Sequence, residues 1–168
     1  SVIRIDKDGA QIKRRPHAMG ICGDAKAVLE TLLPMLSRHQ AAGGAESARQ
    51  ARDAAKDEIG PRLRSHLEVV KIIRDTLPGA VVVGDSAQPI YAANLYYDHD
   101  RPSGWFNSAT GFGALGYAAP ASVGAQLGAP GSTVVCLTGD GGLQFSLAEL
   151  GSAKDINAPV IFVVWNNN

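Results

Sequence analysis

The sequence predicts an α/β fold in which a parallel sheet carries helices on both faces. Three short apolar runs predict buried strands, at residues 80–85, 133–140 and 159–165. Helical segments lie between and before them, and the clearest, residues 63–78, is amphipathic. Strands that alternate with helices along a chain pair in parallel and are covered on both sides.

Composition divides the chain into three parts, residues 1–38, 39–62 and 63–168. The first part contains a predicted strand, "VIRI", then the polar turn "DKDGAQ", and then a helix that Asp24 can cap. The second is rich in alanine and charge and almost free of large apolar residues, so we expect a linker with a solvated helix. The first residues resemble the middle of a strand and the last lie at a strand end, so we expect a fragment.

Charge and cysteine content narrow the class of protein. Sixteen basic residues balance sixteen acidic ones, so no overall field attracts nucleic acid or an anionic membrane. The apolar runs are too short to cross a bilayer. For Cys22 and Cys136, far apart in sequence, we expect two buried, reduced thiols, which suits a cytoplasmic protein.

Small polar residues follow each predicted strand of the sheet, in "VGDSAQ", "TGDGG" and "WNNN". Ligands of α/β proteins bind beyond the carboxyl ends of parallel strands. One such loop is typical of an ordinary turn, but three together indicate a shared site.

The glycine turn at 139–142 carries the most chemical information. Its glycines let backbone amides approach a phosphate, but Asp140 has the wrong charge for one unless a divalent cation lies between them. The 24 residues between Gly141 and Asn166 are enough for one helix and one strand, which would return the asparagines to Asp140. Asp140 and Asn167 would then give two oxygens to one Mg²⁺. Taken alone, the turn is more often only a turn.

The combination "GDG", 24 residues and "NN" resembles the diphosphate- and metal-binding motif of thiamine-diphosphate enzymes. The stretch "ATGFGALGYAAPASVGAQLGAP" is similar to the preceding segment in acetolactate synthases and 2-oxoacid decarboxylases. "VIRIDKDGAQI" and "GDAKAVLETLLPML" resemble the end of that family's central domain. The resemblance implies that 1–38 is the tail of a Rossmann-like central domain, 39–62 a linker, and 63–168 the first part of the diphosphate-binding domain.

The resemblance also implies a cofactor site for thiamine diphosphate and Mg²⁺. Leu115 would be the apolar wedge that bends the cofactor, where many relatives have methionine or isoleucine. The carbonyl of Gly113 would accept a hydrogen bond from the cofactor's exocyclic amine, and the amides of Gly141 and Gly142 would bind the diphosphate. With Asp140 and Asn167 as metal ligands, the full set assigned to the cofactor is Gly113, Leu115, Gly139, Asp140, Gly141, Gly142, Asn167, Ser86 and Gln88.

The activity implied is decarboxylation of a 2-oxo acid through an enamine, which is then protonated or attacks a second carbonyl. The glutamate that activates the cofactor belongs to a separate amino-terminal domain, so we expect no catalytic residue in this chain and no activity from it alone. "NLYYDHDRPSGWFNSATG" and "WNN" are more similar to 5-guanidino-2-oxopentanoate decarboxylase than to acetolactate synthase. The whole enzyme would be a homodimer or homotetramer.

Other interpretations stay open. "GFGALG" fits the GxGxxG pattern of dinucleotide sites, although "GWFNSAT" before it is a poor strand, and a non-catalytic nucleotide-binding module would share the scaffold. Tyr96, Tyr97, His99 and Asp100 could touch substrate or form a solvated loop. We expect His66 at the surface and Trp165 in packing.

Overall fold

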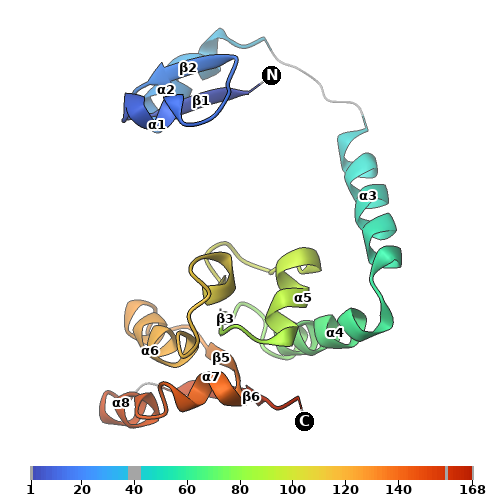
Figure 1. Cartoon of the computed structure of the whole chain (residues 1–168), viewed down its shortest axis with the longest axis vertical. Coiled ribbons are helices and arrows are strands. Elements are labelled where there is room, and N and C mark those ends of the chain that lie inside the picture. The colour runs from blue at the N-terminus through green and yellow to red at the C-terminus, as the bar shows by residue number, and fades with distance from the viewer. Residues whose placement is uncertain (1, 38–42, 158, 168) are drawn as a thin grey trace. The chain divides into compact units, whose positions relative to one another are not determined.

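The computed structural model of the chain describes residues 2–37, 43–157 and 159–167 (Figure 1). These fall into two compact units, residues 1–44 and 45–168. The start of the expected linker, 39–42, and the last asparagine, Asn168, lie outside the described residues. No helix within the described ranges is long and apolar enough to cross a membrane.

The first unit is built on two parallel strands, β1 (Ile3–Asp6) and β2 (Met19–Cys22). Helix α2 (Ala25–Leu32) follows, and a 3₁₀ turn, η1 (Leu33–Met35), continues it. The predicted cap is confirmed, because the carboxylate of Asp24 accepts a hydrogen bond from the amide of Ala27 at 3.1 Å. The prediction of a polar turn at residues 6–11 is partly wrong, because a helix begins within them.

In place of that turn the chain forms a short helix, α1 (Gly9–Lys13). The carboxylate of Asp8 begins it by accepting a hydrogen bond from the amide of Ala10. A helix of one turn is too short to produce a recognisable period in the sequence.

The second unit contains a parallel sheet whose order is β4–β3–β5–β6. The strands are β3 (Val81–Gly84), β4 (Trp105–Asn107), β5 (Val134–Gly139) and β6 (Val160–Trp165). The predicted parallel sheet is therefore confirmed. From the sequence, the segment around β4 was expected to be a poor strand. This prediction was wrong, because the three residues of β4 pair in parallel with β3.

Helices cover both faces of this sheet, as Figure 1 shows. On one face α4 (Pro61–Thr76) and α5 (Gln88–Tyr96) pack against Leu137, and on the other α6 (Ala118–Gly128) packs against Cys136. Neighbouring residues of β5 thus belong to hydrophobic cores on opposite faces of the sheet, as the two-residue period of a strand requires. The spacing that predicted α4 is confirmed, since Leu67 and Val70 are buried.

The connection from β5 to β6 runs through α7 (Asp140–Gln144) and α8 (Glu149–Asp155). It returns the chain parallel to β5 and beside it, as predicted. Strand β6 is less buried than expected, with Ile161 and Val164 42% and 46% exposed. The reason is that in the described part of the sheet β6 is an edge strand, paired with β5 alone.

Helix α3 (Gly44–Glu58) has no buried residue and matches the solvated helix expected between the two outer parts of the chain. Two side chains lie differently from prediction. Cys22 is exposed, although both cysteines are free thiols as expected. His66 is only 8% exposed, because it shares the buried face of α4 with Val70.

Candidate functional site

The carboxyl ends of β3, β5 and β6 open on one cavity of about 260 Å³. Gly139 is the register partner of Trp165, so the chain leaves β5 and β6 at the same level, and the residues that follow are neighbours. The cavity is lined by Ser86, Ala87, Gln88, Tyr91, Leu115, Gly139, Asp140, Gly141, Gly142, Trp165 and Asn167. The structure thus brings together the three polar strand ends noted in the sequence.

Among the described residues that line this cavity, Asp140 is the only charged one. An anionic ligand would meet no lysine or arginine there, so a phosphate could bind only with a cation between it and the carboxylate. Carboxylate and amide oxygens, together with ligand oxygens and water, are a ligand set that suits Mg²⁺. The residues present therefore fit a metal-bridged diphosphate.

The glycines of the turn differ in their surroundings. A Cβ atom added at Gly141 would meet nothing within 4 Å, so the backbone there is accessible to a ligand. A Cβ atom added at Gly142 would meet Oδ2 of Asp85 at 3.0 Å and Oγ1 of Thr138 at 3.2 Å. Gly141 thus leaves space in the cavity, whereas Gly142 lets two strand ends pack closely.

Asp85 was not predicted as a functional residue, although it stands beside Ser86 in "GDSAQ". Its side chain is almost fully buried, at 1% exposure. Its carboxylate accepts hydrogen bonds from the amides of Ser86 at 2.8 Å and Gly116 at 2.9 Å, and from Oγ1 of Thr138 at 3.3 Å. A carboxylate directly after an apolar strand was the available signal in the sequence.

Ser86 and Gly113 lie in contact. The hydroxyl of Ser86 donates to the carbonyl of Gly113 at 3.3 Å and lies 3.1 Å from the hydroxyl of Ser108. Gly113 itself does not line the cavity, whereas the other eight residues predicted for the cofactor do. Leu115 projects from the same loop and is half exposed at the cavity.

Trp165 forms part of the cavity wall as well as packing against the helices. Its indole Nε1 donates to Oε1 of Gln88 at 3.2 Å, and its ring forms a T-shaped pair with that of His66, with centroids 5.4 Å apart. The prediction of a packing role was therefore incomplete. Tyr91 and Ala87, which also line the cavity, had no recognisable signal in the sequence.

The polar residues at the end of α5 form a separate network. Nδ1 of His99 lies 2.9 Å from the hydroxyl of Tyr97, and its Nε2 lies 3.0 Å from the carbonyl of Ala80. Asp100 accepts a hydrogen bond from the amide of Gly79. Burial raises the pKa of Tyr97 to about 12. These residues, with Tyr96, do not line the cavity, and their contacts tie the loop after α5 to the start of β3.

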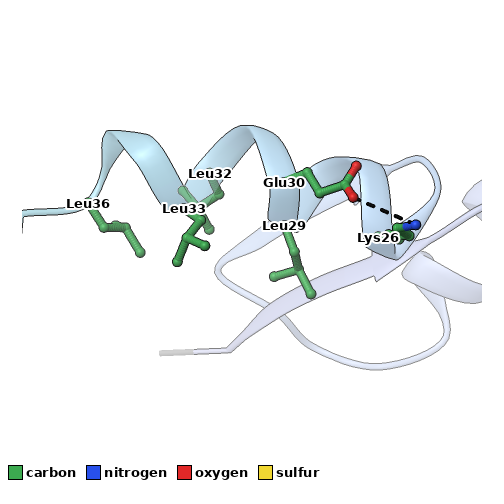
Figure 2. A pocket seen from close by; sticks show the side chains of 6 residues that line it. All are labelled: Lys26, Leu29, Glu30, Leu32, Leu33 and Leu36. Atoms are coloured by element: carbon green, nitrogen blue, oxygen red, sulfur yellow. Dashed lines mark ion pairs between the residues drawn. The ribbon is translucent and has the colours of Figure 1, made fainter.

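A larger depression, of about 580 Å³, lies in the first unit along α2 and η1. Figure 2 shows its leucines, Leu29, Leu32, Leu33 and Leu36, beside an ion pair of 3.7 Å between Lys26 and Glu30. Its lining is aliphatic apart from that exposed pair, so it offers no convergent polar groups for chemistry. The smaller cavity at the strand ends is the better candidate.

Comparison with known proteins points to the same end of the chain. Residues 84–168 match the family model described as "Thiamine pyrophosphate enzyme, C-terminal TPP binding domain". The chain is 34% identical to the acetolactate synthase isozyme 3 large subunit of Escherichia coli, over 99% of the chain and 31% of that protein. It is also 34% identical to a probable 2-ketoarginine decarboxylase of Pseudomonas aeruginosa, again over 99% of the chain and 31% of that protein.

The chain thus spans about a third of the length of these relatives. Among solved structures, the thiamine diphosphate-dependent 4-hydroxybenzoylformate decarboxylase of Rhodococcus jostii superimposes with a TM-score of 0.64 at 24% identity. That match covers 98% of this chain and 30% of the other. At this identity it is the fold that the two share.

Proposed function

Because the chain belongs to the thiamine pyrophosphate enzyme family, we propose that residues 63–168 bind the diphosphate of thiamine diphosphate through Mg²⁺. One observation carries the proposal: the strand ends converge on a cavity at which Asp140, the only charged residue in the described part of its lining, lies beside Asn167 and a glycine turn. Residues 1–38 would be the tail of a central domain, and 39–62 the linker to it.

In this proposal each residue has a distinct task. Asp140 and the side-chain oxygen of Asn167 hold the metal, and the backbone at 139–142 holds the diphosphate oxygens. Ser86 and Gln88 complete the polar wall, while Leu115 supports the cofactor's rings. When bound, thiamine diphosphate would supply a centre that stabilises a carbanion.

We further propose that the whole protein decarboxylates a 2-oxo acid, with a 5-guanidino-2-oxopentanoate decarboxylase as the first candidate. An acetolactate synthase type of carboligation is the second candidate. The acetolactate synthase subunit and the probable 2-ketoarginine decarboxylase are each 34% identical to the chain. The glutamate that activates the cofactor would come from another domain, in a cytoplasmic homodimer or homotetramer.

Calorimetry on the whole protein tests the cofactor site. Thiamine diphosphate should bind in the presence of Mg²⁺ and not in the presence of EDTA, and Asp140→Ala should abolish binding because it removes the anionic metal ligand. Asp155→Ala, which changes an exposed carboxylate on α8, is the matched control and should bind normally. Normal cofactor retention by Asp140→Ala would refute the assignment.

The reaction is tested by supplying 2-oxo acids and measuring products. Release of an aldehyde from 5-guanidino-2-oxopentanoate supports the first candidate, and formation of a hydroxy-keto acid from two molecules of a 2-oxo acid supports the second. Binding of an adenine dinucleotide without thiamine diphosphate would favour a non-catalytic nucleotide-binding module. A dinucleotide-binding GxGxxG stretch follows a strand directly. In the structure this stretch starts at Gly111 and is separated from β4 by a 3₁₀ turn, Ser108–Thr110.

A further inference from the structure

The loop that presents Leu115 to the cavity has little apolar packing to hold it. Phe112 is fully exposed, Leu115 is 50% exposed, and Tyr117 is 38% exposed. Gly113 and Gly116 have φ values of 77° and 82°, which a glycine adopts without a steric cost. What fixes the position of Leu115 must therefore be polar contacts to the loop's backbone.

One of these contacts is the hydrogen bond that the amide of Gly113 donates to the carbonyl of Ser108, at 2.9 Å. Two more come from the consecutive residues that follow β3, Asp85 and Ser86. Ser86 donates to the carbonyl of Gly113, two residues before Leu115. Asp85 accepts a hydrogen bond from the amide of Gly116, one residue after Leu115. Hydrogen bonds from Ser86 and to Asp85 thus hold the backbone on both sides of Leu115, one at a carbonyl and one at an amide.

The same carboxylate also contacts residues at and beside the glycine turn. Oδ2 of Asp85 accepts from Oγ1 of Thr138, which directly precedes the glycine turn, and lies against Gly142. Asp85 is almost fully buried, and its hydrogen bond from the amide of Gly116, at 2.9 Å, is shorter than that from Thr138. Hydrogen bonds to a charged group are stronger than those between neutral groups. One side chain therefore links the loop of Leu115 to the strand that carries Asp140.

We propose that Asp85 is a positioning residue that fixes where Leu115 lies at the cavity, so that binding of the cofactor's rings depends on the Asp85 carboxylate more than binding of its diphosphate does. The proposal rests on the proposed function. Asp85 is not among the described residues that line the cavity, and it acts on Leu115 through the amide of Gly116.

Calorimetry on the whole protein, with Mg²⁺ present, tests this with two ligands: inorganic pyrophosphate and thiamine diphosphate. Asp85→Asn keeps the shape but replaces one acceptor oxygen by an NH₂ group that faces N–H or O–H donors. We expect thiamine diphosphate to bind about tenfold more weakly, since a hydrogen bond to a charged group is lost. Pyrophosphate should lose much less affinity than thiamine diphosphate, because Asp85 meets the glycine turn only at its buried residue, Gly142. Asp75→Asn, at an exposed carboxylate of α4, is the control and should alter neither affinity.

A double variant separates positioning from a general structural effect. If Asp85 acts through Leu115, then Asp85→Asn should cause little further loss in a protein that already carries Leu115→Ala. Should Asp85→Asn fail to fold, Ser86→Ala replaces it, because it removes the hydrogen bond to Gly113 together with the contact with the hydroxyl of Ser108. Ser86 also lines the cavity, so the criterion is again a larger loss of affinity for thiamine diphosphate than for pyrophosphate.

Equal loss of both ligands, or independent effects of Asp85→Asn and Leu115→Ala, would overturn the inference. If the unchanged protein binds neither ligand, the proposed function itself fails. If it binds both and Asp85→Asn changes neither, the function stands and only the role of Asp85 falls.

Discussion

Gly142 and Asp85 lie so close together that a Cβ atom on Gly142 would stand 3.0 Å from Oδ2 of Asp85. The backbone of Gly142 is helical, so its lack of a side chain serves packing and not an unusual turn. The residues that follow β3 and β5 can thus pack closely against each other.

Gly142→Ala should therefore destabilise the protein by about 1–3 kcal/mol, as overpacking of a close contact does. Urea unfolding would report this as a lower midpoint with an unchanged slope. Gly141→Ala is the matched control, because its added methyl group would meet nothing within 4 Å and should leave the midpoint nearly unchanged. Equal losses from the two variants would contradict the packing explanation.

Gly116 and Gly113 offer a second matched pair. Both have positive φ, so alanine at either should cost about 1–2 kcal/mol from the left-handed backbone. Alanine at 116 would also bring its Cβ to 2.7 Å from Cβ of Phe145, whereas at 113 it would meet nothing within 4 Å. We expect Gly116→Ala to lower the free energy of unfolding by more, and a reversed order in chemical unfolding would count against this packing.

A charge exchange tests whether Asp140 and Asn167 bind the same ion. Asp140→Asn should weaken Mg²⁺-dependent pyrophosphate binding by about tenfold or more, because a charge next to the metal is lost. Adding Asn167→Asp to that variant should restore much of the affinity, since the carboxylate then approaches the same ion from the neighbouring strand. No recovery in calorimetry would argue that the two side chains do not share a metal.

The buried thiol of Cys136 should lower the free energy of unfolding at alkaline pH. Burial, assisted by the negative charge of Asp85, raises the pKa of this thiol from 9.0 to about 11. The folded state keeps the proton that an unfolded thiol releases near 9.0, so the free energy of unfolding falls as the pH rises from 9.0 to about 11. Tyr97 acts in the same direction, with a pKa raised by burial from 10.0 to about 12.

The check is the slope of the free energy of unfolding against pH in Cys136→Ala, which should be flatter between those values than in the unchanged protein. Cys22→Ala removes an exposed thiol and should leave the slope unchanged. Alkylation at neutral pH followed by peptide mapping should modify Cys22 and spare Cys136 until the protein is unfolded. Modification of both at equal rates would mean that the strand opens readily.

The parts of this fold that the sequence predicted share one property: their signals are local or follow from simple topology. The spacing between Gly141 and Asn166 was sufficient to predict neighbouring strand ends, because a crossover of that length returns the chain to the adjacent position. The roles of the individual lining residues remain predictions until ligands are bound.

The role of Asp85 could not be predicted in the same way. Its partners Gly116 and Thr138 lie 31 and 53 residues away, and no periodicity connects them. Strand β4 was missed because three residues carry too little pattern, and the burial of His66 was missed because a polar type outweighed its place on the apolar face of α4.

Because the ends of β5 and β6 are adjacent, ligand binding should affect how stable and how abundant the protein is in the cell. Under the proposed function, metal and diphosphate touch both ends and bind only the molecule in which the edge strand is paired. Mass action then adds about 2.7 kcal/mol of stability at a ligand concentration a hundred times the dissociation constant. In a cell short of thiamine the edge would open more often, proteases would remove more of the protein, and vitamin supply would govern its abundance as well as its activity.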